Sequence, residues 1–148
     1  MSFHRSLFSF ARKMRFRANE ADRNVNRTVQ RVGIAAHQTV AIGTPVDTGQ
    51  ARSNWFVTLG APSGDTRPPF FPGEQGSTGA ANVQAVLAEG RGIIGQRKPG
   101  VDLWISNNLP YIGKLNEGSS AQAPAMFVQA AVAEAARVVA NATIFEAP

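Results

Sequence analysis

The sequence predicts an α+β fold: a small antiparallel sheet with a long N-terminal helix, a C-terminal helix and long loops rich in glycine and proline. Three observations support this prediction. Apolar residues recur at helical spacing near both ends, two short segments between them alternate apolar and polar residues, and glycine and proline gather in the middle. The apolar fraction of 43% and the length of 148 residues suit a single globular domain over 1–148, with a basic helix at 1–43 and an α+β body at 44–148.

The N-terminal segment predicts one helix from Ser6 to Ala41 that ends near Gly43. Its apolar stripe comprises Leu7, Ala11, Met14, Ala18, Ala21 and Val25, followed after one extra residue by Val29, Val32, Ala36 and Val40. Residues 1–41 hold eight Arg or Lys and two acidic residues, a net charge of +6, whereas the remainder sums to −1. Because alanine and valine dominate the stripe, we expect it to pack closely against another helix or subunit.

Two strands are predicted at Gln50–Leu59 and Val101–Ser106, where β-branched and aromatic residues alternate with polar ones. The segment Thr44–Gly49 before the first strand is predicted to be a turn, in which the Asp and Thr side chains bond nearby backbone groups. Asn107–Pro110 forms a second predicted turn.

Residues 60–79 contain four prolines and five glycines and are predicted to be a loop. Ser77 or Thr78 is expected to cap a short helix that extends to about Ala88, with Val83, Val86 and Leu87 on its buried side. Residues 90–100 are predicted to be a second loop, glycine-rich and basic. Irregular stretches of this length inside a small domain usually reflect function or mobility.

The C-terminal part predicts a helix from Met126 to about Asn141, which Pro124 precedes as a possible start. Its expected buried face comprises Phe127, Ala131, Ala135, Val138 and Ala142. For Tyr111–Leu115 the sequence leaves two possibilities open, a third strand or the start of a helix.

One segment, Gly90-Arg91-Gly92-Ile93-Ile94-Gly95, matches the dinucleotide-binding fingerprint letter for letter. The fingerprint requires a strand before it and a helix after it, so that the helix N-terminus meets the pyrophosphate. A helix-like stretch precedes this segment, and a basic stretch ending in Pro99-Gly100 follows it. We therefore expect no cofactor, and interpret the segment as a mobile, hairpin-like loop.

The sequence offers no pattern typical of catalysis or metal binding. The chain has no cysteine, and its two histidines, His4 and His37, lie far apart in sequence. Single acids are scattered through the predicted loops and strand ends: Asp47, Asp65, Glu74, Asp102 and Glu117. The hydroxyl groups of Thr48, Ser53 and Ser106 lack the setting of a nucleophile elbow. We therefore predict that the protein is not an enzyme and binds no small-molecule substrate.

The basic N-terminal segment has three interpretations. Arg12, Lys13, Arg15 and Arg17 are candidates for contact with DNA or a partner protein. Phenylalanines among the arginines would also suit a membrane-surface helix. A solvated or partner-facing helix is favoured, because basic helix faces are most often of that kind. No apolar run is long enough to span a bilayer, and no membrane partner is expected.

Two segments resemble the conserved motifs of phage tail-completion proteins, namely the HK97 gp10-like family and the related minor tail protein Z family. The first is Thr44-Pro45-Val46-Asp47-Thr48-Gly49-Gln50-Ala51-Arg52-Ser53-Asn54-Trp55. The second is Ile105-Ser106-Asn107-Asn108-Leu109-Pro110-Tyr111, continued by Leu115-Asn116-Glu117-Gly118-Ser119 and by Gln122-Ala123-Pro124. Asn116 stands where the family commonly has an acid, and the carboxylate of Glu117 follows one residue later.

The resemblance implies a structural virion protein of the head–tail connector, or neck, that is assembled in the host cytoplasm. It implies a homo-oligomer, a ring of six copies between head-closure and tail-terminator proteins, through which genomic DNA passes. The matched positions that become interface candidates are Pro45, Asp47, Thr48, Gly49, Arg52, Trp55, Asn107, Asn108, Pro110, Tyr111, Glu117, Gly118, Gln122 and Pro124. The alternative is a nucleic-acid-binding module that acts through the basic N-terminal helix.

Overall fold

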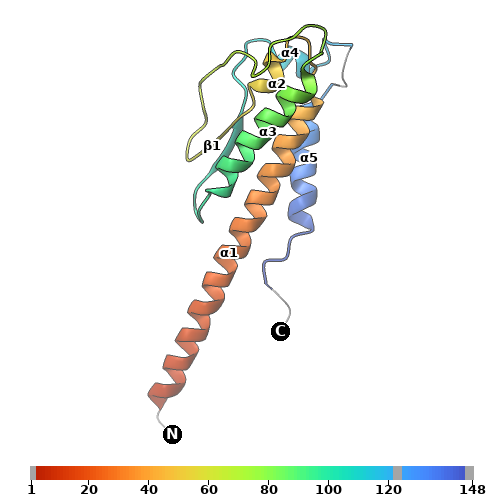
Figure 1. Ribbon diagram of the computed structural model, residues 1–148. Helices are drawn as coiled ribbons and strands as arrows, with labels where there is room; N and C mark the ends of the chain where they lie inside the picture. Colours follow the sequence, from red (N-terminus) through yellow and green to blue (C-terminus); the bar gives the residue numbers. More distant parts are fainter. Residues whose placement is uncertain (1–2, 122–124, 146–148) are drawn as a thin grey trace.

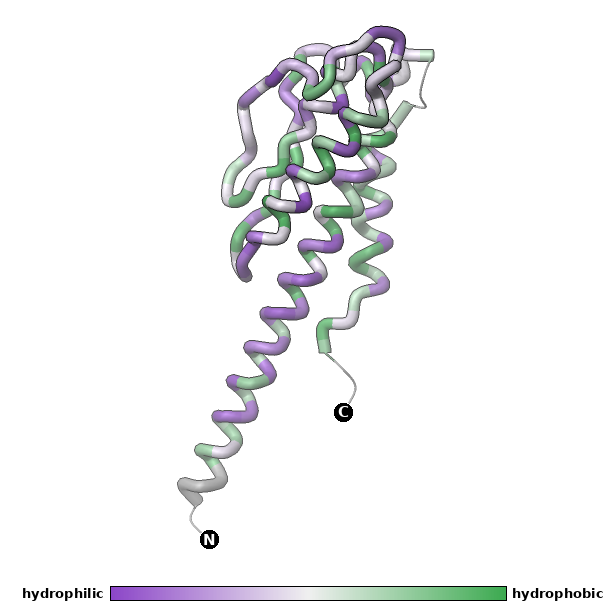
Figure 2. The backbone as a smooth tube through the Cα atoms, in the orientation of Figure 1, coloured by the Kyte–Doolittle hydropathy of each residue, from purple (hydrophilic) through white to green (hydrophobic). Residues whose placement is uncertain are grey.

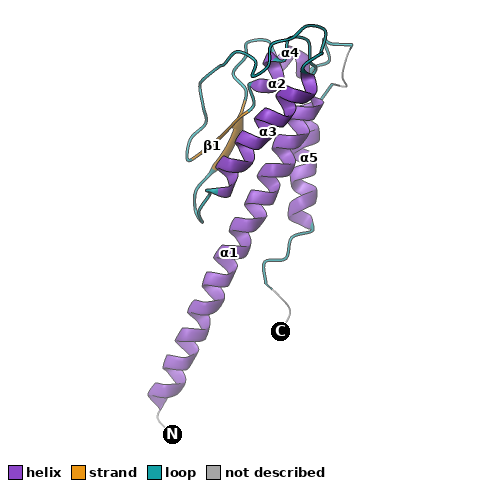
Figure 3. Cartoon of the chain, viewed as in Figure 1, coloured by secondary structure: helices purple, strands orange, loops and turns teal. Residues whose placement is uncertain are grey.

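The computed structural model describes residues 3–121 and 125–145, with side chains from Leu7 onward. Its elements are α1 (Phe3–Gly43), α2 (Gln50–Ser53), β1 (Phe56–Leu59), α3 (Gly79–Gly95), β2 (Leu103–Ser106), α4 (Ile112–Asn116) and α5 (Phe127–Ala140). Figure 3 shows helices carrying most of the structure, with the sheet to one side. The predicted α+β class is confirmed, with a long N-terminal helix, a two-stranded antiparallel sheet and a C-terminal helix.

Helix α1 is the axis of the molecule. Its 41 residues extend for about 60 Å at the usual rise per residue. Its C-terminal half lies between α3 and α5, whereas its N-terminal half projects away from every other element (Figure 1). We call residues 3–20 of α1 the arm, and the opposite end of the molecule, where α2, α4 and the long loop lie, the apex.

The core forms where α1 meets α5 antiparallel to it. Val40 and Ala41 are buried against Phe127 and Ala131, so the apolar faces predicted for both helices are confirmed in this region. The helices approach closely at Gly43, where an added Cβ would lie 2.8 Å from the Cβ of Phe127. Packing at this distance requires glycine at position 43, which has no side chain.

On its other side α1 packs against α3, again through glycine. A Cβ on Gly90 of α3 would lie 2.4 Å from the ring of His37, which is 1% exposed. A Cβ on Gly33 of α1 would lie 2.8 Å from Cδ1 of Leu103. The two glycines therefore permit the close contact that joins α1 to α3 and the sheet.

The sheet pairs β1 with β2 in the register Phe56↔Ser106, Val57↔Ile105, Thr58↔Trp104 and Leu59↔Leu103. Val57 is buried, whereas Trp104 is exposed on the other face. A two-stranded sheet is marginal alone. Here it is supported by the helices against which its apolar face packs.

Two strand predictions were too long. Residues 50–53 form α2, because Gly49 adopts a left-handed φ of 89° and the amide of Ser53 donates to the Gly49 carbonyl, closing a helical turn. Alternation of buried and half-buried positions begins only at Trp55. The second strand begins at Leu103 because a turn closes just before it, with the Val101 amide donating to the Lys98 carbonyl.

The prediction of a loop at 90–100 was wrong for 90–95, which continue α3 to Gly95. The packing of Gly90 on His37 offsets the low helix propensity of glycine. The fingerprint-like segment is therefore helical, neither a strand–turn–helix nor a mobile hairpin. The helix begins at Gly79, after Thr78, whose side chain makes no capping bond to the helix backbone.

Three further predictions of secondary structure are confirmed. Residues 60–78 contain no helix or strand, as predicted, and Val83, Val86 and Leu87 lie on the inward side of α3. For residues 111–115 the helical possibility is confirmed by α4. The C-terminal helix spans Phe127–Ala140, close to prediction, whereas Gln122 and Pro124 lie outside the described residues.

Candidate functional site

The first motif begins by closing the C-terminal end of α1. Thr44 is fully buried, and its hydroxyl donates to the Val40 carbonyl at 2.6 Å and accepts from Nε1 of Trp55 at 2.8 Å. The Trp55 ring in turn meets Phe127 edge-on, with centroids 6.1 Å apart. Thr44 and Trp55 thus join the end of α1 to the start of β1 and to α5.

Arg52 binds the same helix end from outside. Its Nε donates to the Thr44 carbonyl at 2.8 Å and its Nη2 to the Ile42 carbonyl at 3.2 Å. Partial burial lowers the pKa of Arg52, which stays protonated. A cation on the last carbonyls of a helix satisfies orphan acceptors and complements the helix dipole.

Gly49 allows the motif to approach α3. A Cβ there would lie 2.2 Å from Nδ2 of Asn82, and its left-handed φ disfavours any L side chain. Asn82 is fully buried and donates to the carbonyls of Phe71 and Thr78, at 2.8 and 2.9 Å. Its Oδ1 accepts from Oγ of Ser53 at 2.7 Å and from the Phe71 amide at 2.9 Å.

A second buried asparagine, Asn54, holds the other half of the 60–78 loop. Its Nδ2 donates to the Arg67 carbonyl at 2.7 Å, and its Oδ1 accepts from the Arg67 amide at 2.8 Å. The Arg67 guanidinium forms a bidentate ion pair with Glu89 and lies 4.0 Å from the Phe56 ring centroid. The loop is therefore pinned in place, although its composition alone predicts irregular backbone.

The aspartate of the first motif also reaches this loop. Oδ1 of Asp47 accepts from the Gln75 amide at 3.0 Å, and its backbone carbonyl accepts from the Gly76 amide at 2.9 Å. The expectation that Asp47 would satisfy backbone groups of its own turn was wrong. Thr48 does bond locally, since its hydroxyl accepts from the Gln50 amide at 3.4 Å, a long contact.

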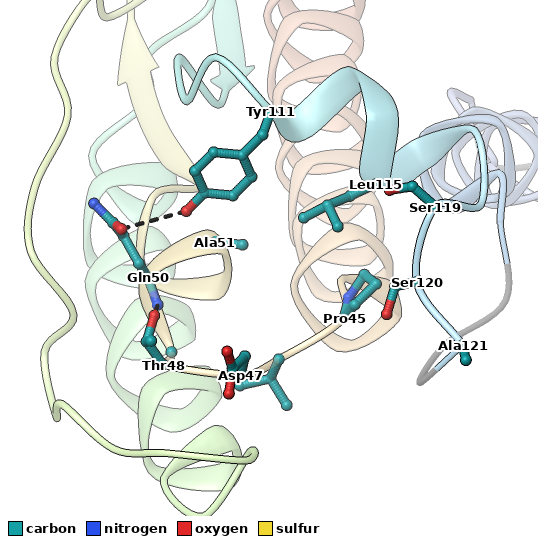
Figure 4. Close-up of a pocket in the computed structure, with 12 residues that line it drawn as sticks. Pro45, Asp47, Thr48, Gln50, Ala51, Tyr111, Leu115, Ser119, Ser120 and Ala121 are labelled. Carbon is teal, nitrogen blue, oxygen red and sulfur yellow. Dashed lines mark hydrogen bonds between the residues drawn. The ribbon is translucent and has the colours of Figure 1, made fainter.

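The second motif folds against the first. Nδ2 of Asn107 donates to the Ala51 carbonyl at 3.0 Å, and the Tyr111 hydroxyl donates to Oε1 of Gln50 at 3.3 Å (Figure 4). Nδ2 of Asn108 donates to the Ser63 and Asp65 carbonyls at 2.8 and 2.9 Å. Partial burial raises the pKa of the Tyr111 phenol, so the hydroxyl remains a donor at neutral pH.

An open groove of about 700 Å³ lies between the two motifs. Its walls are Pro45–Ala51 from the first motif and Tyr111, Leu115 and Ser119–Ala121 from the second. Figure 4 shows Asp47 and Thr48 on one side of this groove and Ser120 and Ala121 on the other. Five of the predicted interface residues, Pro45, Asp47, Thr48, Gly49 and Tyr111, therefore share this surface.

Asn116 has a capping role that sequence reasoning did not assign. Its Oδ1 accepts from the Val128 amide in the first turn of α5 at 2.9 Å, and its backbone carbonyl accepts from the Met126 amide at 2.7 Å. An acid at this position would accept the same amide bond. The neighbouring Glu117 is exposed, and Gly118 follows it with a φ of 97°.

The predicted residues thus separate into four groups. Pro45, Asp47, Thr48, Gly49 and Tyr111 line the groove, whereas Arg52, Trp55, Asn107 and Asn108 brace the apex beneath and beside it. Pro110, Glu117 and Gly118 are exposed without lining it, and Arg12, Lys13, Arg15 and Arg17 lie at the far end of the molecule on the arm.

Ser53, Asn54, Arg67 and Asn82 were missed as site residues. Asn82 lies one helical turn before Val86, on the buried side of α3, and this spacing is the one signal that pointed to it. Among the described residues no cluster of His, Cys, Asp or Glu is arranged to hold a metal ion. Over the same part of the chain, no helix is long and apolar enough to cross a membrane.

No family model matches the chain, and neither a curated protein nor a solved structure matches it. The motif resemblance and the geometry of the apex and arm are therefore the basis for a functional proposal.

Proposed function

We propose that the protein is a tail-completion subunit in the neck of a tailed bacteriophage. It acts by assembling into a ring of six copies between head-closure and tail-terminator proteins, and not by catalysis. The ring makes the tail competent to join the head and leaves a channel for genomic DNA. The protein is accordingly a virion component that is assembled in the host cytoplasm.

The observation that carries this proposal is the convergence of the two motifs. They are separated by about fifty residues, yet Asn107 and Tyr111 bond directly to the segment that follows Gly49, and both motifs line one groove. A resemblance spread over unrelated surfaces would have been weaker support. Residues that share one surface, and are held there by hydrogen bonds from the residues around them, are typical of a functional site.

The pinned loop at the apex suits contact with a neighbouring ring. Phe70 and Phe71 are 36% and 49% exposed, although Asn82 and Ser53 hold their backbone. Exposed aromatic side chains on an ordered backbone bind at low entropic cost. We therefore assign the inter-ring contact to residues 60–78, and not to 90–100, most of which is helical.

The test is complementation of a phage from which this gene has been deleted, with particles viewed by negative-stain electron microscopy. We expect DNA-filled heads beside unjoined tails in the deletion, and joined virions when the wild-type gene is supplied. The variant Phe70→Ser/Phe71→Ser should fail to restore joining, whereas the matched loop variant Thr66→Ala should restore it. Normal virions without the gene would overturn the proposal.

A second candidate function, nucleic-acid binding through the arm, is favoured by one observation. Arg12, Lys13, Phe16 and Arg17 line one shallow hollow of the arm. Cations beside an aromatic ring suit phosphate and base contact. Removing Arg12 and Lys13 together would then lower the salt slope of DNA binding by about 2 units, whereas Arg31→Ala, on the part of α1 beside the body, would change it little. Salt-independent or absent binding would reject this candidate.

A further inference from the structure

The apolar stripe of α1 continues beyond the part of the molecule that covers it. In the C-terminal half of the helix, Val40 and Gly43 pack against α5. At 100° per residue, Leu7 and Met14 fall on the same side of the helix as Gly43. In the arm, however, this side is bare, with Leu7 and Met14 53% and 52% exposed, because α5 ends far above them (Figure 1).

The arm also exposes phenylalanine beside this stripe, with Phe10 61% and Phe8 76% exposed. Figure 2 shows apolar and polar residues interleaved along the projecting part of α1. Buried aromatic side chains each cover about 150–250 Å², so the arm leaves several hundred Å² of apolar side chain in water. An exposed apolar face of this size is typical of an interaction site.

A matching surface lies on α5. Val128, Val132 and Val139 fall within about 40° of one another around that helix, on a face centred about 100° from Phe127 and Ala131. Their exposed fractions are 38%, 65% and 55%. The stripe from Val128 to Val139 spans twelve residues, as does the arm stripe from Leu7 to Ala18, so their lengths agree.

Charge distinguishes this partner from a second arm. Arg12, Lys13, Arg15 and Arg17 flank the arm stripe within six residues, so two arms side by side would bring like charges together. Helix α5 carries Glu134 and Arg137, which neutralise each other in an ion pair at 2.6 Å. The neutral α5 surface therefore accepts the basic arm without this repulsion.

We infer that the arm of one copy binds the exposed valine face of α5 in a neighbouring copy, antiparallel to it, as α1 and α5 pair within one chain. In this arrangement Leu7 lies opposite Val139, Met14 opposite Val132 and Ala18 opposite Val128. Each copy gives an arm to one neighbour and receives an arm from another, so the contact is heterologous and forms a ring when its rotation closes. The contact rests on these two surfaces, and only its closure into six copies rests on the proposed function.

Disulfide cross-linking tests the contact, because the chain has no cysteine of its own. One full-length chain carries Met14→Cys and a second, distinguishable by mass, carries Val132→Cys. The pair cannot form within one chain, because Met14 lies 26 residues, about 39 Å along α1, from Val40 beside α5. The matched control replaces Met14→Cys with Arg12→Cys, on another side of the same helix.

We expect the mixed chains to form on the order of tenfold more covalent heterodimer than the control pair, because docking holds the two thiols at a high effective concentration. Adding Leu7→Ser and Phe10→Ser to the first chain should abolish this excess. Heterodimer at the level of the control, or a predominance of Met14→Cys homodimer, would overturn the inference. Neither result depends on whether deletion of the gene leaves heads and tails unjoined, so the inference and the proposed function can fail separately.

Discussion

The apex and the arm differ in how their polar and apolar groups are placed. At the apex, the buried asparagines Asn54 and Asn82 bond to backbone groups of the proline-rich loop in the same chain. In the arm, helical backbone satisfies itself, whereas the apolar side chains remain in water. The backbone of the apex loop is therefore held within one copy, whereas the contact that we infer covers the apolar face of the arm only in a second copy. Substitutions of the buried asparagines at the apex should lower monomer stability, and substitutions in the arm should change assembly alone.

The largest effect is expected for Asn82→Ala. This change leaves the Ser53 hydroxyl and the Phe71 backbone groups without their partner, and should lower the free energy of unfolding by about 3 kcal/mol. Urea denaturation measures it, with Gln84→Ala, an exposed position on the same helix, as the control. Equal stability of the two variants would show that Asn82 does not hold the loop.

A smaller loss is expected for Gly90→Ala, because the new Cβ would overlap the buried His37 ring. We expect a destabilisation of about 2 kcal/mol, measured by thermal and urea unfolding. Gly92→Ala is the matched control on the same helix, where nothing lies within 4 Å of the added Cβ. That variant should be stabilised by about 0.5 kcal/mol through helix propensity. Loss of stability in both variants would mean that the helix, not the contact with α1, is responsible.

Burial of His37 in this contact also predicts that the free energy of unfolding depends on pH. Burial lowers the pKa of His37 below its usual 6.5, while its Nε2 lies 3.1 Å from the Trp55 carbonyl. The unfolded chain therefore binds more protons than the folded chain just below pH 6.5. The free energy of unfolding is consequently highest above this pH and decreases as the pH falls. The slope is at most about 1.4 kcal/mol per pH unit for one proton. Urea unfolding between pH 5 and 7 measures it, and a His37→Gln variant that kept the full dependence would contradict the assignment.

The smallest effect on stability is expected in the arm. Leu7→Ser/Phe10→Ser should change the free energy of unfolding by no more than about 0.5 kcal/mol, because the exposed side chains lose no packing. Chemical denaturation of the monomer should therefore show little change for this variant, whereas cross-linking between copies should be lost. Substantial destabilisation would show that the arm packs against its own body in solution.

Local pattern was sufficient for the elements whose residues are repeated at regular spacing. The extent of α1, the position of α5, the class of the fold and the irregular course of residues 60–78 follow from periodicity and from proline and glycine content. The motifs also identified the groove residues Pro45 to Gly49, although not that Asp47 reaches across to Gln75. These features depend on neighbours in sequence.

Features that depend on distant partners were not predictable from local pattern. Residues 90–95 are helical because Gly90 meets His37, and the loop is ordered because Asn54 and Asn82 supply the bonds that its prolines cannot make. Glycine in a helix is unfavourable by propensity, and it becomes favourable here only because a distant side chain packs into the space beside it. Asparagine in a core is unfavourable unless distant groups form hydrogen bonds with its amide. The sequence therefore specified the regular framework, and long-range packing specified which polar and glycine residues build the apex.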